Sequence, residues 1–128
     1  KTFTESLLDF MMMQPRSEQC LEVCCGYLKN LLRSGNTDSD QMCQMNLDVI
    51  VNSASQNLLH SCLARRKGAA LALLSIRQPL FTESSNYDKY CLYMIYLAIS
   101  NLVLFHEGSD HILEILIIIR KAVATHHP

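Results

Sequence analysis

Two long apolar segments joined by a short glycine-containing loop constrain this chain more than any other feature. The first runs from Tyr87 to Phe105 and the second from Asp110 to about Thr125, with Gly108 in the loop. In the first segment, apolar residues recur at the three- and four-residue spacing of a helix. The second holds the run from Ile112 to Ile119, in which only Glu114 is polar. By periodicity alone that run could also be a buried strand.

A strand needs partners, and no other stretch of the chain predicts one. The two segments are therefore predicted to form a hydrophobic helical hairpin. The first helix is apolar nearly all round, so we expect it to be buried on more than one side. We expect the second to be the central helix of the domain.

A membrane insertion is the other structure to test for this hairpin. Cys91 to Phe105 contains fifteen residues without a charge, whereas a spanning helix needs about 20. Asp88, Lys89 and Glu107 bracket the segment closely. We therefore expect a buried core hairpin and no membrane partner.

Helical spacing and turn signals divide the rest of the chain into further helices. They are expected over Thr2–Met13 with a cap at Thr4, from Ser17 to a stop at Ser34–Asn36, from Asp38 to a break at Ser53–Ser55, from about Gln56 through Leu63, and over Ala69–Arg77. Pro15 and Pro79 are expected to end helices, because proline cannot continue a helix interior. Gly35 is expected in the left-handed conformation past a helix end.

Two stretches between these helices are less regular. Arg65 to Gly68 interrupts the apolar pattern, and the sequence leaves open whether Gly68 ends a helix or only weakens it by about 1 kcal/mol relative to alanine. Leu80 to Asn86 is rich in Ser and Thr and is expected to be a connector.

These elements predict an all-α fold, an antiparallel helical stack of about six to seven helices, with an irregular helical bundle as the alternative. A single domain is expected over residues 1–128, and a hydrophobic fraction of 49% is enough for one core. The chain starts at Lys1 and ends in His126-His127-Pro128. We therefore expect it to be a fragment of a larger protein.

Charge and cysteine usage limit the partners and the compartment. With 11 basic and 12 acidic side chains the charge is balanced, which argues against nucleic acid as a partner because that requires clustered Lys and Arg. Six cysteines lie inside apolar helical patterns: Cys20, Cys24, Cys25, Cys43, Cys62 and Cys91. We expect them to be reduced core residues of an intracellular protein, in the nucleus or the cytoplasm.

A weaker copy of the hairpin precedes it. Leu28–Arg33, Gly35 and Ser39–Met42 match Ile99–Leu104, Gly108 and Ser109–Ile112. Each copy has an apolar helix with an Asn near its end, a glycine turn, a Ser-Asp cap and a second apolar helix. Asn30 and Asn101 lie 71 positions apart, which leaves room for one further helical pair between them.

The second copy resembles a helix of armadillo repeats. Ala98-Ile99-Ser100-Asn101-Leu102 is similar to the pattern Ala-Leu-x-Asn-Leu, and Gly108 to Leu113 fits the turn into the last helix of such a repeat. The usual Gly-Gly-Ile-Pro-like turn is missing. The armadillo/HEAT-type resemblance implies a right-handed stack whose concave face binds extended peptides or partner domains. It also makes Asn30 and Asn101 candidate partner contacts, with capping of local backbone groups as the alternative.

Two other stretches are candidate partner contacts. Arg65, Arg66 and Lys67 form the only basic run and could contact a phosphate or an acidic peptide; a solvated turn is the alternative. Met11 and Met12 belong to an apolar stripe on the first helix, and methionine adapts to varied partner surfaces. For them, core packing is the alternative.

Catalytic and metal-binding patterns are weak. His106, His111 and Glu114 lack a further ligand at a suitable spacing for a metal site, and no cofactor motif is present. We therefore predict a non-enzymatic interaction scaffold or adaptor that binds a partner protein or peptide. It could form homo- or hetero-oligomers through exposed apolar helices. The alternative is a helical regulatory or catalytic fragment that uses Cys and His chemistry not revealed by spacing.

Overall fold

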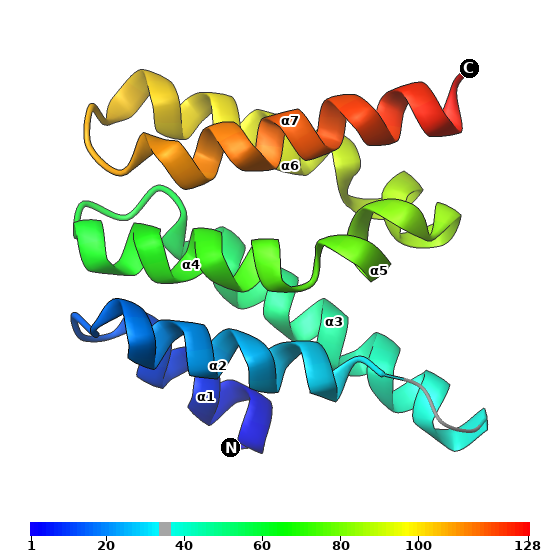
Figure 1. Cartoon of the computed structure of the whole chain (residues 1–128), viewed down its shortest axis with the longest axis horizontal. Coiled ribbons are helices and arrows are strands. Elements are labelled where there is room, and N and C mark those ends of the chain that lie inside the picture. Colours follow the sequence, from blue (N-terminus) through cyan, green and yellow to red (C-terminus); the bar gives the residue numbers. More distant parts are fainter. Residues whose placement is uncertain (34–36) are drawn as a thin grey trace.

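The chain folds into an all-helical stack in a computed structural model, which describes residues 1–33 and 37–128 (Figure 1). Over these residues there are seven helices and no strand, which confirms the all-α prediction. The helices are α1 (Phe3–Met12), α2 (Glu18–Leu31), α3 (Thr37–Asn57), α4 (Leu63–Ser75), α5 (Arg77–Thr82), α6 (Ser84–Leu104) and α7 (Ser109–His126). Within the described part of the chain, no helix is both long and apolar enough to cross a membrane.

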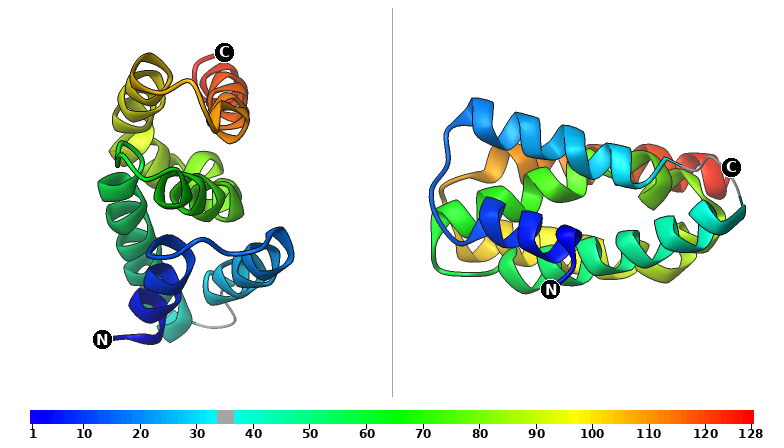
Figure 2. Two further views of the ribbon diagram at one scale, coloured as in Figure 1. Left: turned by 90° about the vertical axis from the view of Figure 1, so that its left-hand side faces the viewer. Right: turned by 90° about the horizontal axis from the view of Figure 1, so that it is seen from below.

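The helices form three antiparallel pairs stacked on one another. Helix α1 pairs with α2, α3 with α4, and α6 with α7. The left-hand view of Figure 2 shows two layers, with α1, α3 and α6 in the first and α2, α4 and α7 in the second. The short helix α5 leads from α4 to α6 and packs on both α6 and α7.

Hydrogen bonds between neighbouring helices of the first layer have a nearly constant sequence offset. They join residues 41 to 43 positions apart: Thr4 to Asn46, Gln44 to Asn86, Asp48 to Lys89 and Tyr90, and Leu58 to Asn101. The same offset between α1 and α3 and between α3 and α6 indicates stacked units of similar length. The match between Asn30 and Asn101 does not follow this offset.

The upstream copy of the hairpin, which spans α2 and α3, is therefore not one helical pair of the stack. Helix α2 belongs to the first pair and α3 to the second. Helix α2 belongs to the second layer and packs on α4 and α1, whereas α6 belongs to the first layer. Asn30 is exposed near the end of α2, and Asn101 is buried in α6. The two asparagines are thus not structural equivalents. Gly35 lies outside the described residues.

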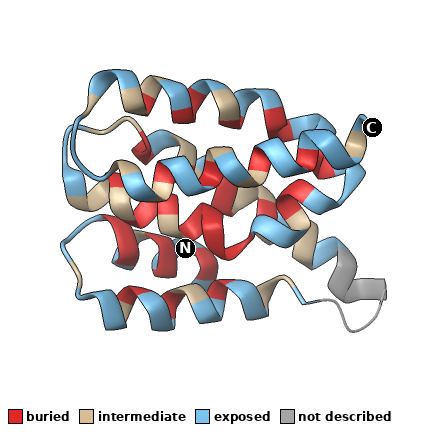
Figure 3. Ribbon diagram, turned by 45° about the horizontal axis from the view of Figure 1, so that its top comes forward, coloured by how far each residue is buried: buried red, intermediate tan, exposed pale blue. Residues whose placement is uncertain are grey.

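Helix α4 is the most enclosed helix of the stack. It packs against α1, α2, α3 and α7, and its buried middle holds Gly68, Ala69, Ala70 and Ala72. Figure 3 shows buried residues gathered between the outer helices. Because α7 lies at one end of the stack, the prediction that it is the central helix is wrong. Its buried side, which includes Ile115, faces the other helices.

A close backbone approach explains the glycine in α4. A methyl group on Gly68 would lie only 2.6 Å from the carbonyl oxygen of Met11 in α1. Two heavy atoms cannot approach so closely without a shift of one helix. Gly68 therefore neither ends α4 nor merely weakens it, because the absence of a side chain allows α1 and α4 to touch.

Two predicted breaks are helical in the structure. Helix α3 continues through Ser53–Ser55, and Ala54 within that stretch is fully buried. Pro79 is the third residue of α5, where the backbone N–H would have no partner within the helix in any case. The connector predicted over Leu80–Asn86 is accordingly helical for most of its length. The helix predicted from about Gln56 begins instead at Leu63.

Local capping signals set several helix ends. The Ser17 hydroxyl accepts a hydrogen bond from the Cys20 N–H at 3.1 Å, as the predicted cap of α2. Helix α1 is capped by Thr2, which forms a reciprocal capping box with Glu5. The predicted cap Thr4 is instead buried and hydrogen-bonds Asn46. Gly108 precedes α7 with a φ of 74°, a left-handed conformation suited to glycine.

Substitution of the two helical glycines by alanine tests the close approach of α1 and α4. Gly68→Ala should lower the free energy of unfolding by about 1–3 kcal/mol through overpacking, despite the better helix propensity of alanine. Gly26→Ala in α2 is the matched control, because no atom lies within 4 Å of the added methyl group. That change should raise stability by roughly 0.5–1 kcal/mol. Urea unfolding measures both, and stabilisation by both changes would contradict the packing described.

Candidate interaction surfaces

One side of α6 carries large apolar side chains that the described residues leave uncovered. Leu92, Tyr96, Ile99 and Val103, here called the α6 stripe, are all exposed, with Leu92 at 83% and Val103 at 74%. Their spacing of four, three and four residues places them along one side of the helix. Helix α6 packs on α5 and α7 and is hydrogen-bonded to α3, so it is covered on more than one side as expected, but the stripe faces solvent.

Helix α7, the partner of α6, also exposes apolar side chains. Leu113 and Ile117, one turn apart, are also exposed. Helices α6 and α7 together form one end of the stack, at the top of Figure 1. This end therefore exposes apolar side chains from two paired helices.

The opposite end of the stack also exposes apolar side chains, but charged groups lie among them. Phe3 and Phe10 on α1 and Val23 and Tyr27 on α2 are exposed. The Arg16 guanidinium lies 3.7 Å from the centre of the Phe10 ring and covers part of it.

Three hollows on the side of the second layer share Arg77. The largest, about 590 Å³, lies where α2 and α4 end and α5 begins. A hollow of about 350 Å³ lies between α2, α4 and α7, and one of about 250 Å³ lies between α5 and α7. Because Arg77 lines all three, we name them together the Arg77 groove. The two larger hollows fall within the range of about 300–1,000 Å³ that is typical of ligand sites, and the smallest lies just below it.

The groove has charged walls and a partly apolar floor. Lys29, Arg33 and Arg77 line its largest hollow, together with one carboxylate, that of Glu83. Leu71 and Leu74 of α4 line the hollow between α2, α4 and α7, together with the carboxylates of Glu18, Glu22 and Glu114. The end of the groove near α5 is therefore basic, and the adjoining hollow combines acidic groups with some apolar surface.

The Arg77 side chain forms a weak, exposed ion pair. Its Nη1 lies 3.3 Å from Glu114 Oε1, and both side chains are about half exposed. An exposed ion pair of this kind contributes about 0–1 kcal/mol. Arg77 can therefore turn toward a ligand in the groove at little cost.

The predicted basic run lies within the first turns of α4 and has separate roles. Arg66 is only 6% exposed; its Nη1 donates to the carbonyl oxygens of His60 and Ser61, each at 2.9 Å. Its guanidinium also lies 3.8 Å from the centre of the Phe105 ring. Arg66 thus ties the loop before α4 to the end of α6.

The other two residues of the run differ from Arg66 in burial and contacts. Lys67 forms an ion pair with Glu18 across α4 and α2. Arg65 is half-buried. The three cations therefore do not form one exposed patch, because the first turns of α4 spread them over different sides of the helix.

The remaining predicted contacts divide between surface and core. Asn30 is exposed beside Lys29 of the groove, whereas Asn101 is 1% exposed and donates from Nδ2 to the Leu58 carbonyl at 2.8 Å. Met11 and Met12 are fully buried in the core. A contact between a partner and Asn101, Met11 or Met12 would require these side chains to leave the interior.

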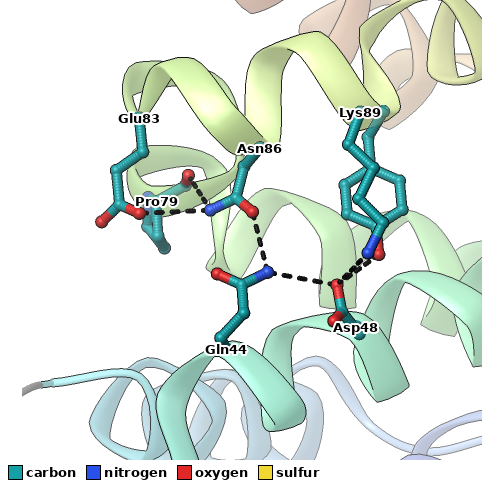
Figure 4. A network of polar contacts seen from close by, with 7 residues as sticks. Gln44, Asp48, Pro79, Glu83, Asn86 and Lys89 are labelled. Carbon is teal, nitrogen blue, oxygen red and sulfur yellow. Dashed lines mark hydrogen bonds and ion pairs between the residues drawn. The ribbon is translucent and has the colours of Figure 1, made fainter. Parts of the chain in front are cut away.

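Sequence reasoning did not identify the polar network between α3 and α6 (Figure 4). Gln44 Nε2 donates to Asn86 Oδ1 at 2.9 Å and to Asp48 Oδ1 at 3.2 Å. Asn86 Nδ2 donates in turn to the Pro79 carbonyl at 2.9 Å and to Glu83 at 3.2 Å. These groups satisfy one another, so the network fixes the alignment of the helices.

Asp48 also receives hydrogen bonds from Tyr90 and Lys89. Burial and the bond to the Asp48 carboxylate raise the pKa of the Tyr90 hydroxyl. The sequence signal for the network is a pair of matching spacings. Gln44 and Asp48 are four residues apart, as are Asn86 and Tyr90.

The cysteines differ in exposure. Cys24 and Cys91 are buried as predicted, but Cys62 is exposed just before α4. Burial raises the pKa of the Cys25 thiol to about 11. Hydrogen bonding from the backbone N–H groups of Arg65 and Ala64 lowers the pKa of the Cys62 thiol. Among the described residues, no group of three or more His, Cys, Asp and Glu side chains could hold a metal ion.

These differences predict one fast-reacting thiol. Because its pKa is lowered and it is exposed, Cys62 should carry more thiolate at neutral pH than Cys25 and react first with a maleimide. Cys62→Ser should remove the fast phase of labelling, and Cys25→Ser should leave it unchanged. Mass spectrometry of partly labelled protein measures this. A fast phase that persists in Cys62→Ser would show that the exposed position of Cys62 is wrong.

No known protein family, curated protein or solved structure matches this chain. A function cannot be transferred from a relative, and an all-helical fold by itself does not specify one. The exposed surfaces and the groove are therefore the basis for the function proposed below.

Proposed function

We propose that this chain is a non-enzymatic protein-interaction domain that binds an extended segment of a partner protein in the Arg77 groove. The observation that carries this proposal is the meeting of three hollows at Arg77, along helices α2, α4 and α7 that run side by side (Figure 1). A surface hollowed along several helices offers a long contact to a chain that lies across them.

The stack is proposed to be of the armadillo/HEAT type. The offset of 41 to 43 residues between helices of the first layer supports this, because repeats of this class are about 40–47 residues long. In such stacks one layer of parallel helices forms the partner-binding face. Here that layer would be α2, α4 and α7.

The chemistry of the groove favours a particular kind of segment. Lys29, Arg33 and Arg77 at the α5 end suit an acidic side chain or a carboxylate. Leu71 and Leu74 suit apolar side chains of the same segment. Asn30 is exposed but lines none of the three hollows, so its proposed contact with the backbone of the segment is based on the sequence resemblance.

A catalytic role that uses Cys and His chemistry is the second candidate, and Cys62 is the observation that favours it. Its neighbour His60 accepts a hydrogen bond at Nδ1 from the Cys62 backbone N–H at 2.9 Å. That ring nitrogen is therefore occupied, and only Nε2 of His60 is left to act as a base for a thiol. The intracellular location expected from the cysteine pattern stays a prediction.

Charge reversal in the groove tests the proposal. Immobilised wild-type domain is used to capture proteins from a cell extract, in parallel with Lys29→Glu/Arg33→Glu and with Arg120→Glu. Arg120 is exposed on α7 and lies outside the groove. The groove variant should lose the specifically captured proteins at least tenfold, and Arg120→Glu should retain them. Equal capture by all three proteins would contradict binding in the groove.

A further inference from the structure

We propose that the α6 stripe is a self-association surface, on which a second copy of this chain docks with its own α6 antiparallel to the first. This contact is separate from the Arg77 groove, which lies on the second layer, whereas α6 belongs to the first (Figure 2). The occupant is therefore a second copy and not the partner segment proposed for the groove.

The spacing of the stripe is self-complementary. Reading from Leu92 to Val103 gives steps of four, three and four residues, and the reverse direction gives the same steps. A two-fold axis through the middle of the stripe would place Leu92 against Val103 of the second copy and Tyr96 against Ile99. A dimer interface with two-fold symmetry requires one patch to match itself in this way. Steps of four and three also suit the packing of two long helices.

The α6 stripe can form the apolar centre of a dimer interface. Each of its four side chains is at least half exposed, from 50% at Ile99 to 83% at Leu92. A standard interface buries about 800 Å² per partner around such a centre, with a more polar rim. Tyr96 adds an aromatic side chain, a type enriched at interfaces.

The lack of unpaired charges also favours self-association at this end of the stack. Helix α6 has no Asp, Glu, Lys or Arg after Lys89, and the Lys89 ammonium is held by Asp48 on α3. A contact between α6 stripes therefore buries no unpaired charge. The α1–α2 end is different, because Arg16 lies over Phe10 there. This makes the α6 stripe a better match for itself than for the opposite end of another copy.

Sedimentation of purified protein tests the association. Wild type should sediment at micromolar concentration as a dimer, with twice the 14.5 kDa mass of the chain. Leu92→Asp/Ile99→Asp should sediment as a monomer with unchanged circular dichroism, because both side chains are exposed in the monomer. The matched control Phe3→Asp/Val23→Asp, at the other end, should remain dimeric.

A second measurement tests the geometry. Within one helix Leu92 and Val103 lie about 16 Å apart, too far for a methyl–methyl nuclear Overhauser effect. In a dimer of mixed isotope labelling, the antiparallel contact should give such an effect between Leu92 of one copy and Val103 of the other.

Three results would overturn the proposal. The first is a monomeric wild type. The second is assembly that is lost in the Phe3/Val23 variant and therefore runs head to tail. The third is an effect between the two Leu92 side chains, which the antiparallel register described here does not allow. None of these results bears on the Arg77 groove, which only the capture experiment tests.

Discussion

The packing of α4 against its neighbours is the contact on which the rest of the structure depends. Helix α4 touches α1, α2, α3 and α7, and a run of glycine and alanine allows these helices to come close. At Gly68 the approach leaves no room for a side chain beside Met11. Small residues contribute little apolar area themselves, but they bring the larger side chains of four helices into one core. Arg66 continues this role at the start of α4 by holding the preceding loop and Phe105.

A core centred on α4 leaves the two outer pairs half-covered, which gives the domain its surfaces. The α6–α7 pair buries one side against the stack and exposes the α6 stripe on the other. The polar network from Gln44 to Asp48 and Asn86 fixes the orientation of α6 on α3. The α6 stripe therefore has a fixed orientation relative to the rest of the stack. On the second layer, the largest hollow of the Arg77 groove lies where α2 and α4 end and α5 begins. The fold thus presents a charged groove with one basic end, and an apolar end of the stack, as separate surfaces.

Local signals in the sequence predicted local structure well. Ser17, Pro15 and Gly108 marked helix ends, because capping and left-handed turns depend on nearest neighbours. Sequence patterns whose structural outcome depends on distant contacts gave wrong predictions. Ser53-Ala54-Ser55 looked like a break, yet the buried Ala54 keeps α3 continuous. The α6–α7 hairpin looked central because it is the most apolar segment, whereas the helix with four neighbours is α4, in which Gly68 allows the close approach of α1. For the candidate site, Asn30 lies at the surface and Asn101 in the core, and only the three-dimensional packing distinguishes them.

Hydrogen exchange of the native protein, followed by NMR for individual amides, tests most directly whether α4 is the centre of the stack. The amides of Ala69 to Leu74 are expected to exchange most slowly, through global unfolding alone. Protection should fall toward α1–α2 on one side and α6–α7 on the other. If the amides of α7 around Ile115 exchange more slowly than those of α4, the core is centred on the hydrophobic hairpin, and the arrangement described here is wrong.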